Sequence, residues 1–472
     1  MVDGAMQSYA LTLDRFLDHA AKWHGGAEIV TASSFGAERV GYAAARDRAL
    51  RMSAVLAGYG VGQGERVATL AWNTQAHFEA WYAIIGMGAV CHTLNPRLTP
   101  LQIAAMLRQS GAAVMLVSAD LAPLAQQILD QGTAVAQILL IDEAAERVPA
   151  GLGGRSGASV AVLEQALAGA QGDLGNALRW GGFSEEIPSG LCFTSGTTAA
   201  PKGVTYTHRS SFLHTLRLLQ ADVLGITAAD AVLAAVPMFH ANGWGLPFAV
   251  PAVGAKLVLP GRHLDGASLA RLIAAEGVTV AAGVPTVWLG LIQHLDACGG
   301  ALPSLRRILV GGAPLPAALM ALIEQRLGAT VQTSWGMTEL SPLGTMARPG
   351  EPHRDAARSG RPALGVDLLL TDATGTALPE QRNVEGHLRV RGASAVARYF
   401  GEATLATDAK GWFDTGDLAR LDDEGNLMIT GRAKDLIKSG GEWINPAEIE
   451  AIIRENGIVY THSPGTTPTL LR

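Results

Sequence analysis

The chain has 472 residues, and at roughly 150 residues per domain this length predicts several packed units instead of one core. Its 36 basic and 42 acidic side chains leave a formal net charge of −6, which argues against nucleic acid as the main partner. No run of about 18 apolar residues is free of Pro, Gly or charge, so we expect no membrane-spanning helix.

The N-terminus carries no basic cluster, so we expect no secretory signal and predict a cytoplasmic protein. Cys91, Cys192 and Cys298 are widely spaced and have no His partner at ligand spacing. We therefore expect neither a disulfide framework nor a zinc site, and interpret the three cysteines as buried thiols.

From about residue 64 to 335, short apolar runs alternate with amphipathic stretches. A strand at 66–71 precedes a helix whose apolar residues recur at helical spacing: Phe78, Trp81, Tyr82 and Ile85. Further strands are predicted at 113–118, 137–141, 231–236, 256–259, 278–282, 308–310 and 330–334, with a helix at 315–327. This alternation predicts parallel sheets covered by helices on both faces, with ligands at the carboxyl ends of the strands.

Two other regions differ in composition. Residues 151–175 are rich in Gly, Ala and Ser, and we expect them to link the two sheet-bearing halves, with a helix at 161–167 interrupting them. Beyond residue 345, short strands at 366–370, 387–390 and 427–429 predict a small β subdomain. The predicted fold class is α/β, with two helix-flanked sheets and this β subdomain.

Residues 192–208 form the most informative stretch, because they combine hydroxyls, glycines and a lysine in one short loop. The loop follows the apolar end of a strand at 191–193 and precedes a predicted helix at 209–219. Gly196 and Gly203 let the backbone approach a ligand closely, and Lys202 adds a mobile positive charge. The hydroxyls that can donate hydrogen bonds to anionic oxygens are Thr194, Ser195, Thr197 and Thr198. The loop therefore predicts a phosphate site.

A P-loop of the pattern G-x-x-x-x-G-K-[ST] does not fit, because Pro201 and Gly203 flank the lysine where that pattern needs a glycine and a hydroxyl. A polar surface loop remains an alternative. The strand before the loop and the helix expected after it favour the phosphate site.

Three further segments carry side chains suited to a nucleotide: 311–314, 335–339, and 415–417 followed by 431–435. Paired glycines at 311–312 allow the backbone close to a flat purine, and Trp335 offers a stacking face. Glu339 is a hard oxygen ligand suited to Mg²⁺, and Asp417 can accept hydrogen bonds from ribose hydroxyls. Taken singly, each segment also fits a turn, a core tryptophan or a strand cap.

The order Ser-Gly-Thr-Thr-x-x-Pro-Lys-Gly, together with these three segments, resembles the adenylate-forming superfamily over residues from about 30 to 450. Within it the chain looks like a fatty-acyl-CoA synthetase. The resemblance implies that Thr194 to Gly203 hold the ATP phosphates, and that Thr338 and Glu339 bind the α-phosphate and Mg²⁺, with Thr194 close to the metal.

The same resemblance implies roles for the other segments. Gly312, Ala313, Pro314 and Trp335 would line the adenine site, with Gly336 and Met337 in the same nucleotide-binding segment. Asp417 and Arg432 would bind the ribose. Lys434 would be the hinge of a small C-terminal domain, and Lys438 and Trp443 would lie in the segment that closes over nucleotide and acyl carrier.

The implied reaction is the ATP-dependent activation of a carboxylic acid. The carboxylate attacks the α-phosphorus of ATP to give an acyl-adenylate and pyrophosphate, and the thiol of coenzyme A then displaces AMP. Mg²⁺ and lysine offset the charge that develops on the phosphates. The expected partners are therefore small molecules, and a homodimer is a family expectation.

Acid specificity is predicted to lie in residues 236–247. His240 and Trp244 are four residues apart, so in a helix they would share one face and bracket a slot. A core histidine and a core tryptophan are the alternative. The resemblance implies that Trp244 gates an acyl tunnel, with Gly283 and residues 341–343 in its lining. The expected substrate is therefore a medium- to long-chain fatty acid, and a short thioether acid such as 3-methylthiopropionate is the alternative.

The end of the chain departs from the family pattern, because no lysine follows Lys438 and only a short polar tail follows Glu450. Family members present near their C-terminus a lysine that bridges carboxylate and ATP. We expect a large domain at 1–431, with its β subdomain from about 345, and a hinge with a truncated α+β domain at 432–472. A second hypothesis is a nucleotide-binding remnant that keeps both sites but adenylates poorly.

Overall fold

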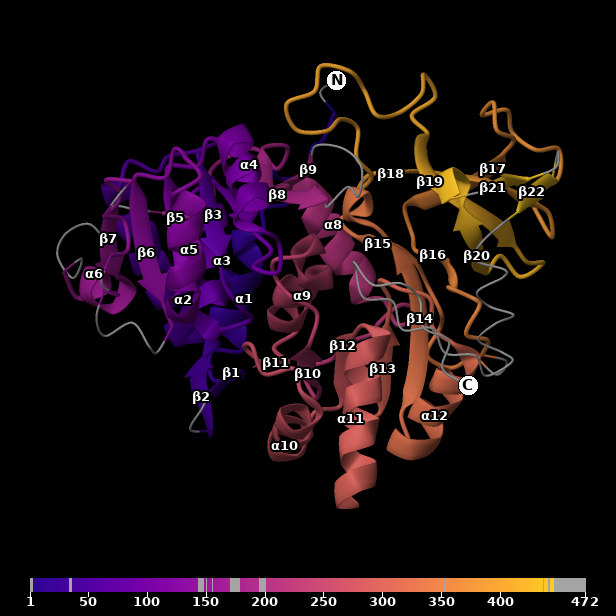
Figure 1. Ribbon diagram of the computed structural model, residues 1–472, viewed down its shortest axis with the longest axis horizontal. Coiled ribbons are helices and arrows are strands. Elements are labelled where there is room, and N and C mark those ends of the chain that lie inside the picture. The colour runs from indigo at the N-terminus through magenta and orange to yellow at the C-terminus, as the bar shows by residue number, and fades with distance from the viewer. Residues whose placement is uncertain are drawn as a thin grey trace.

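The structure is a computed structural model that describes residues 3–33, 36–142, 148–149, 151–154, 156–169, 179–194, 201–351, 354–435, 437–439 and 442–444. Two large sheets covered by helices stand next to each other, and a smaller sheet lies beside the second (Figure 1). The predicted α/β fold class is confirmed.

The first large sheet has seven strands among the described residues, in the order β7-β6-β5-β3-β4-β8-β9. Its strands are β3 (Arg66–Leu70), β4 (Val90–Thr93), β5 (Val114–Ser118), β6 (Gln137–Ile141), β7 (Ser159–Val162), β8 (Pro188–Thr194) and β9 (Lys202–Thr207). Strand β9 runs antiparallel to β8, whereas the other neighbours pair in parallel. Every residue of β5 is buried, as expected for a strand covered on both faces.

The second large sheet has nine strands in the described part of the chain, in the order β16-β15-β14-β13-β12-β10-β11-β1-β2. Its strands are β1 (Glu28–Ser33), β2 (Gly36–Gly41), β10 (Ala231–Ala234), β11 (Lys256–Leu259), β12 (Val280–Gly283), β13 (Arg307–Val310), β14 (Thr330–Gly336), β15 (Leu343–Met346) and β16 (Arg361–Pro362). The central strands from β1 to β14 are parallel, and β2, β15 and β16 pair antiparallel at the two ends.

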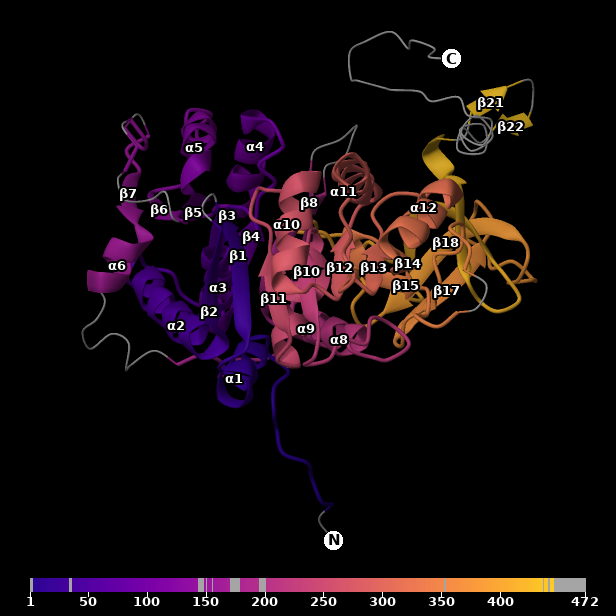
Figure 2. The same ribbon diagram turned by 90° about the horizontal axis from the view of Figure 1, so that it is seen from below.

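Helices cover both sides of these sheets (Figure 2). The described helices are α1 (Asp14–Trp23), α2 (Tyr42–Gly58), α3 (Gln75–Gly86), α4 (Pro100–Ser110), α5 (Ala122–Leu129), α6 (Leu163–Gly169), α8 (His208–Leu218), α9 (Leu246–Ala252), α10 (Gly266–Glu276), α11 (Pro285–Cys298) and α12 (Ala317–Leu327). Local signals explain several ends: Thr99 forms a capping box at the start of α4, and Gly111 ends it in the left-handed conformation.

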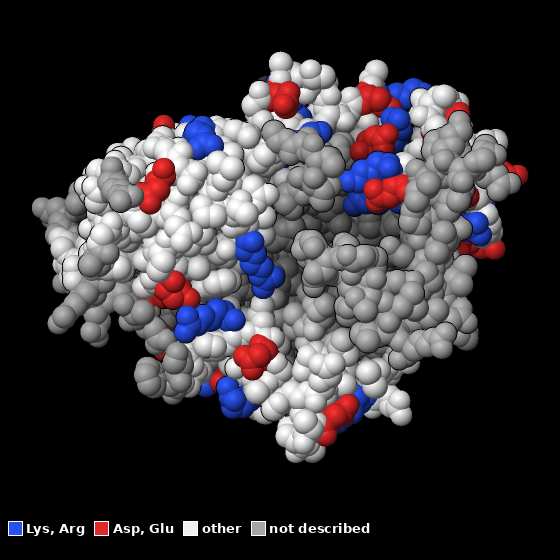
Figure 3. All heavy atoms as spheres, viewed as in Figure 1, with Lys and Arg blue, Asp and Glu red and all other residues white. Residues whose placement is uncertain are grey.

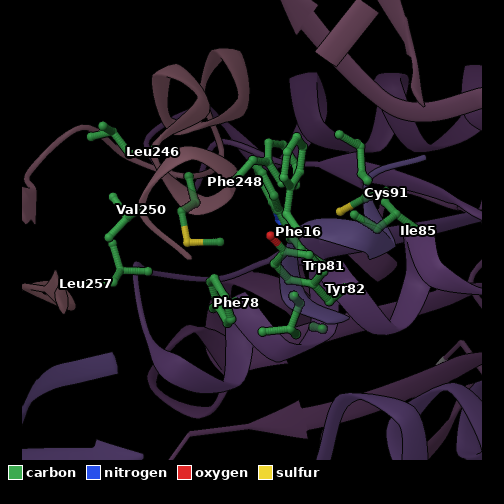
Figure 4. Close-up of a cluster of buried hydrophobic side chains, with 14 of the residues drawn as sticks. Phe16, Phe78, Trp81, Tyr82, Ile85, Cys91, Leu246, Phe248, Val250 and Leu257 are labelled. Atoms are coloured by element: carbon green, nitrogen blue, oxygen red, sulfur yellow. The ribbon is translucent and has the colours of Figure 1, made fainter. Parts of the chain in front are cut away.

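One apolar cluster lies between the two large sheets (Figure 4). Phe16 of α1, Trp81 of α3 and Phe248 of α9 meet there, and all three are nearly inaccessible to solvent. The hydroxyl of Tyr82 donates to the carbonyl of Pro247 over 3.0 Å. Helix α3 thereby supports the start of α9, which is the end of the predicted acid-binding segment.

The smaller sheet is antiparallel and contains, within the described ranges, β17 (Val366–Thr371), β18 (Glu385–Gly392), β19 (Phe413–Leu421) and β20 (Leu427–Arg432) in that order. Its buried cluster includes Trp335 and Leu340, which belong to β14 and the segment after it. A short β21–β22 hairpin (Ile437–Ser439 and Glu442–Ile444) follows. The remaining described helical turns are η1 (Ala119–Leu121), η2 (Ala241–Gly245), η3 (Thr338–Leu340) and η4 (Ala433–Asp435).

Three sequence-based expectations about the fold are wrong. Strand β9 stands between the phosphate loop and the helix predicted to follow it directly, because Lys202–Thr207 pairs with β8. Within 151–175, β7 belongs to the seven-stranded sheet, so this region does not simply link the two halves. Cys298 is exposed at the end of α11, whereas Cys91 and Cys192 are buried as expected.

None of the helices in the described ranges has the length and apolar character that a bilayer crossing needs. On the face that Figure 3 shows, acidic and basic side chains are scattered among uncharged ones and do not gather into a patch of one sign.

Candidate active site

The predicted site segments follow the carboxyl ends of parallel strands in both large sheets. Thr194 ends β8, Gly311 follows β13, and Trp335 and Gly336 end β14. In an open α/β sheet this edge is where ligands bind. The strand directions are consistent with the predicted placement of the site at the carboxyl ends of the strands, and the site itself stays a prediction.

The phosphate loop is described only at its two ends. Ser195, Gly196, Thr197 and Thr198 lie outside the described residues. Thr194 and Lys202 pair across β8 and β9, and the hydroxyl of Thr194 donates weakly to the carbonyl of Lys202 over 3.4 Å. Gly203 packs closely against Phe400: a Cβ added to residue 203 would lie 2.9 Å from the Cβ of Phe400. This close approach therefore leaves no room for a side chain at residue 203.

The Thr338–Glu339 turn is held from two directions. The hydroxyl of Tyr206 donates to the carbonyl of Thr338 over 2.9 Å, and the hydroxyl of Tyr399 donates to Oε1 of Glu339 over 2.9 Å. Burial and the charge of Glu339 raise the pKa of Tyr399, so its phenol keeps the proton that it donates. Sequence reasoning assigned no role to either tyrosine. Tyr206 lies in the 192–208 stretch but was not among the hydroxyls predicted to bind phosphate, and Tyr399 lies outside every motif.

The residues present fit a magnesium ion. Glu339 is only 8% exposed, and no ion pair joins its carboxylate to any Lys, Arg or His of the described chain. A buried carboxylate without a cationic partner is costly, so a bound cation would stabilise it. Mg²⁺ takes oxygen ligands, often one or two carboxylates together with substrate phosphates. Glu339 and the hydroxyl of Thr194 are suitable ligands.

Trp335, Asp417 and Arg432 are in direct contact. The indole Nε1 of Trp335 donates to Oδ2 of Asp417 over 3.0 Å, and Nε of Arg432 lies 2.8 Å from Oδ1. Burial raises the pKa of Asp417, while Arg432 and the hydrogen bond from Trp335 act in the opposite direction. A carboxylate has about four acceptor positions, so Asp417 retains capacity for ribose hydroxyls.

The predicted adenine turn lies against the predicted acid gate. Gly312 has a φ of +77°, and a Cβ there would lie 3.5 Å from the indole of Trp244. Ala313 and Pro314 follow it and are exposed. Gly336 stands at a bulge between β14 and β15, where a Cβ would come within 2.4 Å of the carbonyl of Pro342. The amide of Met337 donates to the same carbonyl over 3.0 Å.

A small cavity joins the two sides of the site. Its volume is about 60 Å³. Nucleotide-side residues in its lining are Gly312, Trp335, Gly336, Met337 and Thr338. Its other lining residues are His214, Leu218, His240, Ala241, Trp244, Leu309, Pro342, Leu343 and Met346, of which residues 240, 241, 244, 342 and 343 belong to the segments predicted to bind the acid.

The backbone around Trp244 differs from the helix that we considered. Asn242, Gly243 and Trp244 have φ values of 55°, 54° and 53°, all in the left-handed region. His240 and Trp244 therefore do not share a helical face, although both line the cavity. Gly283 is not among the lining residues. It packs against Trp288 of α11, since a Cβ added to Gly283 would lie 2.9 Å from Cζ2 of that indole.

Two histidines line the cavity and differ in their exposure to solvent. His240 is exposed, yet the protein atoms around its ring still lower its pKa by desolvation, which favours the neutral form at neutral pH. His214 of α8 is 1% exposed, and burial lowers its pKa to about 3. Its Nε2 has no hydrogen-bond partner. Sequence reasoning missed His214, since it lies outside every motif.

The predicted hinge and closing residues are only partly described. Lys434 is exposed in η4, immediately after β20. Lys438 and Trp443 are paired in the β21–β22 hairpin, and their side chains lie outside the described part.

The fold and the site together define the adenylate-forming class of enzyme. Residues 17–400 match the family model described as "AMP-binding enzyme", and the chain belongs to this family.

Curated relatives extend over most of the chain. It is 39% identical over 463 residues to a 3-methylmercaptopropionyl-CoA ligase of Ruegeria lacuscaerulensis, covering 95% of this chain and 84% of that protein. It is 39% identical over 459 residues to a medium-chain-fatty-acid–CoA ligase of Ectopseudomonas oleovorans, covering 95% and 82%. For a long-chain-fatty-acid–CoA ligase of Thermus thermophilus the identity is 40% over 459 residues, covering 94% and 81%.

Solved structures agree in fold. An anthranilate CoA ligase in complex with anthranoyl-AMP superposes with a TM-score of 0.83 at 23% identity, covering 98% of this chain and 87% of that chain. An o-succinylbenzoate CoA synthetase of Bacillus subtilis in complex with ATP and a magnesium ion gives 0.75 at 23%, covering 96% and 88%. The prediction of an AMP-forming acid–CoA ligase, a class that uses ATP, Mg²⁺ and coenzyme A, is confirmed.

Proposed function

We propose that this chain activates a medium- to long-chain fatty acid as its acyl-adenylate and transfers it to coenzyme A. The observation that carries the proposal is the cavity shared by Gly312 and Trp335 on the nucleotide side and by His240 and Trp244 on the acid side. A site that transfers the adenylyl group of ATP to a carboxylate needs the two reactants next to each other, because correct orientation removes much of the barrier.

The proposed roles follow from the chemistry of each side chain. Lys202 would donate to phosphate oxygens, and Asp417 with Arg432 would bind the ribose. Thr194, Thr338 and Glu339 would hold the α-phosphate and the metal, and Mg²⁺, when bound, supplies charge that offsets the developing charge of the phosphates. The apolar lining around Leu309 would keep water away from the activated acid.

The size of the cavity favours a second candidate acid. Ligand pockets usually have volumes of roughly 300–1,000 Å³. The cavity of about 60 Å³ is far smaller, so a long acyl chain requires Trp244 or another lining side chain to move. A short thioether acid such as 3-methylthiopropionate needs much less movement, and two relatives carry the corresponding name.

Thioester formation with a panel of acids tests the proposal. Fatty acids from C4 to C16 and 3-methylthiopropionate are each incubated with ATP, Mg²⁺ and coenzyme A, and acyl-CoA and pyrophosphate are measured. We expect turnover with a preference among the longer acids, and a preference for the thioether acid would favour the second candidate. Nucleotide binding without pyrophosphate release for any acid would support the nucleotide-binding remnant instead.

We further propose the large domain at 1–431, with the β subdomain from about 345, and a following domain that turns about Lys434. The exposure of Lys434 after the last strand of the small sheet supports this hinge. We also propose a cytoplasmic homodimer acting on small molecules. Cys91, Cys192 and Cys298 are free thiols, which suits a reducing compartment. Light scattering of the purified protein tests the dimer.

A further inference from the structure

Tyr399 contacts two proposed catalytic side chains that come from different segments. Its hydroxyl donates to Oε1 of Glu339 over 2.9 Å, and Nζ of Lys202 lies 4.8 Å from the centre of its ring. Tyr399 itself belongs to the loop that joins β18 to β19. Three segments that are distant in the chain therefore meet at one phenol.

The backbone of the Tyr399 loop is bound to Glu339 and to Gly203, the residue that follows Lys202. The amide of Val396 donates to the carbonyl of Glu339 over 2.7 Å, and the amide of Phe400 donates to the carbonyl of Gly203 over 2.7 Å. These two bonds lie on either side of Tyr399 in the sequence. They fix the position of its backbone relative to both the glutamate turn and the lysine strand.

A lysine and a glutamate close to one nucleotide site create a specific problem. If Lys202 paired directly with Glu339, the ammonium would occupy carboxylate oxygens that a metal ion needs, and the carboxylate would neutralise the charge that phosphates need. The phenol of Tyr399 satisfies each group separately. Its hydroxyl uses one of the acceptor positions of the carboxylate, and its ring face attracts the ammonium.

We propose that Tyr399 is a positioning residue that keeps Lys202 and Glu339 apart, so that the ammonium remains available to the phosphates of ATP and the carboxylate to the metal ion. This inference rests on the proposed function, because both side chains belong to its nucleotide site. Tyr399 acts through its two neighbours and has no chemical step of its own.

Tyr399→Phe separates the two contacts, because it keeps the ring and removes the hydroxyl. Calorimetric titration with ATP is carried out once in EDTA and once in MgCl₂. We expect Tyr399→Phe to weaken binding in MgCl₂ roughly tenfold to a hundredfold, as for the loss of one hydrogen bond to a charged group, and to leave binding in EDTA unchanged. Tyr399→Leu removes both contacts, so it should weaken binding in EDTA as well.

The control is Tyr59→Phe, which removes another partly buried phenol oxygen, at the end of α2. It should leave both titrations unchanged. A misfolded variant would lose binding in EDTA and MgCl₂ alike, so the difference between the two titrations isolates the metal-dependent effect. Mn²⁺ bound with ATP, followed by electron paramagnetic resonance, gives a second measurement of the same difference.

The outcomes distinguish the inference from the proposed function. Equal affinity of wild type and Tyr399→Phe in MgCl₂ overturns the inference and leaves the nucleotide site standing. Absence of ATP binding by the wild-type chain in MgCl₂ overturns both. A selective loss in MgCl₂ for Tyr399→Phe supports the positioning role, because a misfolded variant would lose binding in both titrations.

Discussion

The proposed nucleotide side and the proposed acid side of the site are built by different interactions. On the nucleotide side, directional contacts orient the functional groups, such as the hydrogen bond from Trp335 and the ion pair from Arg432 to Asp417. On the acid side, a left-handed turn and apolar packing shape a small cavity, and His214 lines it with an unpartnered Nε2.

This difference explains why short sequence motifs indicate the ligand of one side more readily than that of the other. A hydrogen bond or ion pair depends on a few atoms of defined chemistry, so the residue types alone indicate the ligand group. The shape of a cavity depends on side chains from several elements, and small changes in any of them alter it. Mutations on the two sides should therefore affect different measurements.

The largest effect should come from Gly245→Ala on the acid side. Gly245 has a φ of +76°, and a Cβ there would lie 2.6 Å from Cε1 of His214. The left-handed backbone and the clash together should lower the free energy of unfolding by about 2–4 kcal/mol. Denaturant unfolding measures this loss. The folded fraction of Gly245→Ala should still bind ATP with wild-type affinity. A lower ATP affinity in that fraction would show that the acid side and the nucleotide side are not independent.

Gly132→Ala is the matched control for that variant. Gly132 has a φ of +75° and no heavy atom within 4 Å of the position of its Cβ. It should show only the backbone cost of about 1 kcal/mol. Equal losses at residues 132 and 245 would contradict the packing role of His214.

Asp417→Ala should weaken ATP binding without changing the choice of acid. The substitution removes the acceptor of Trp335 Nε1 and the partner of Arg432. Loss of charged hydrogen bonds of this kind should reduce ATP affinity roughly tenfold to a hundredfold, measured by calorimetry. Asp414→Ala is the control, since Asp414 lies on the same strand with a side chain that is 52% exposed. An altered ranking of acids with Asp417→Ala would argue against separate roles.

The smallest effect should be a shift in acid preference with Trp244→Ala. Trp244 lines the cavity and packs on the Gly311–Gly312 turn. Removal of its indole should enlarge the cavity and favour longer acids by roughly tenfold relative to C4, about the effect of a single methylene group in an apolar pocket. Trp23→Ala, at a residue 65% exposed, is the control. An unchanged profile from C4 to C16 would remove the gate assignment.

Much of the fold could be predicted because the signals are local. The apolar runs that became β5 and β6, and the helical spacing of Phe78, Trp81 and Tyr82 in α3, are determined by residues a few positions apart. Strand β9 was missed because its pairing with β8 is what makes Lys202–Thr207 a strand. The pairing of β1 with β11 connects residues far apart in sequence, so no local pattern indicates it.

The acid side was predicted less well for a similar reason. The four-residue spacing of His240 and Trp244 suggested a helix, but the Asn242-Gly243 dipeptide is a signal for positive φ, and the backbone is left-handed there. His214 and Tyr399 belong to no motif, and they join the site through packing of α8 and of the loop before β19. The roles assigned to the site residues stay predictions.

The amino-acid sequence by itself determined the class of chemistry, because the hydroxyls, the lysine and the carboxylates suited to a nucleotide stand in short stretches at recognisable spacing. Only the tertiary structure decided that Trp335 and Arg432 meet on Asp417, that Trp244 lies against Gly312, and that one phenol contacts both Lys202 and Glu339. These contacts join segments separated by long stretches of chain. They arise from how the sheets pack, which no local sequence pattern records.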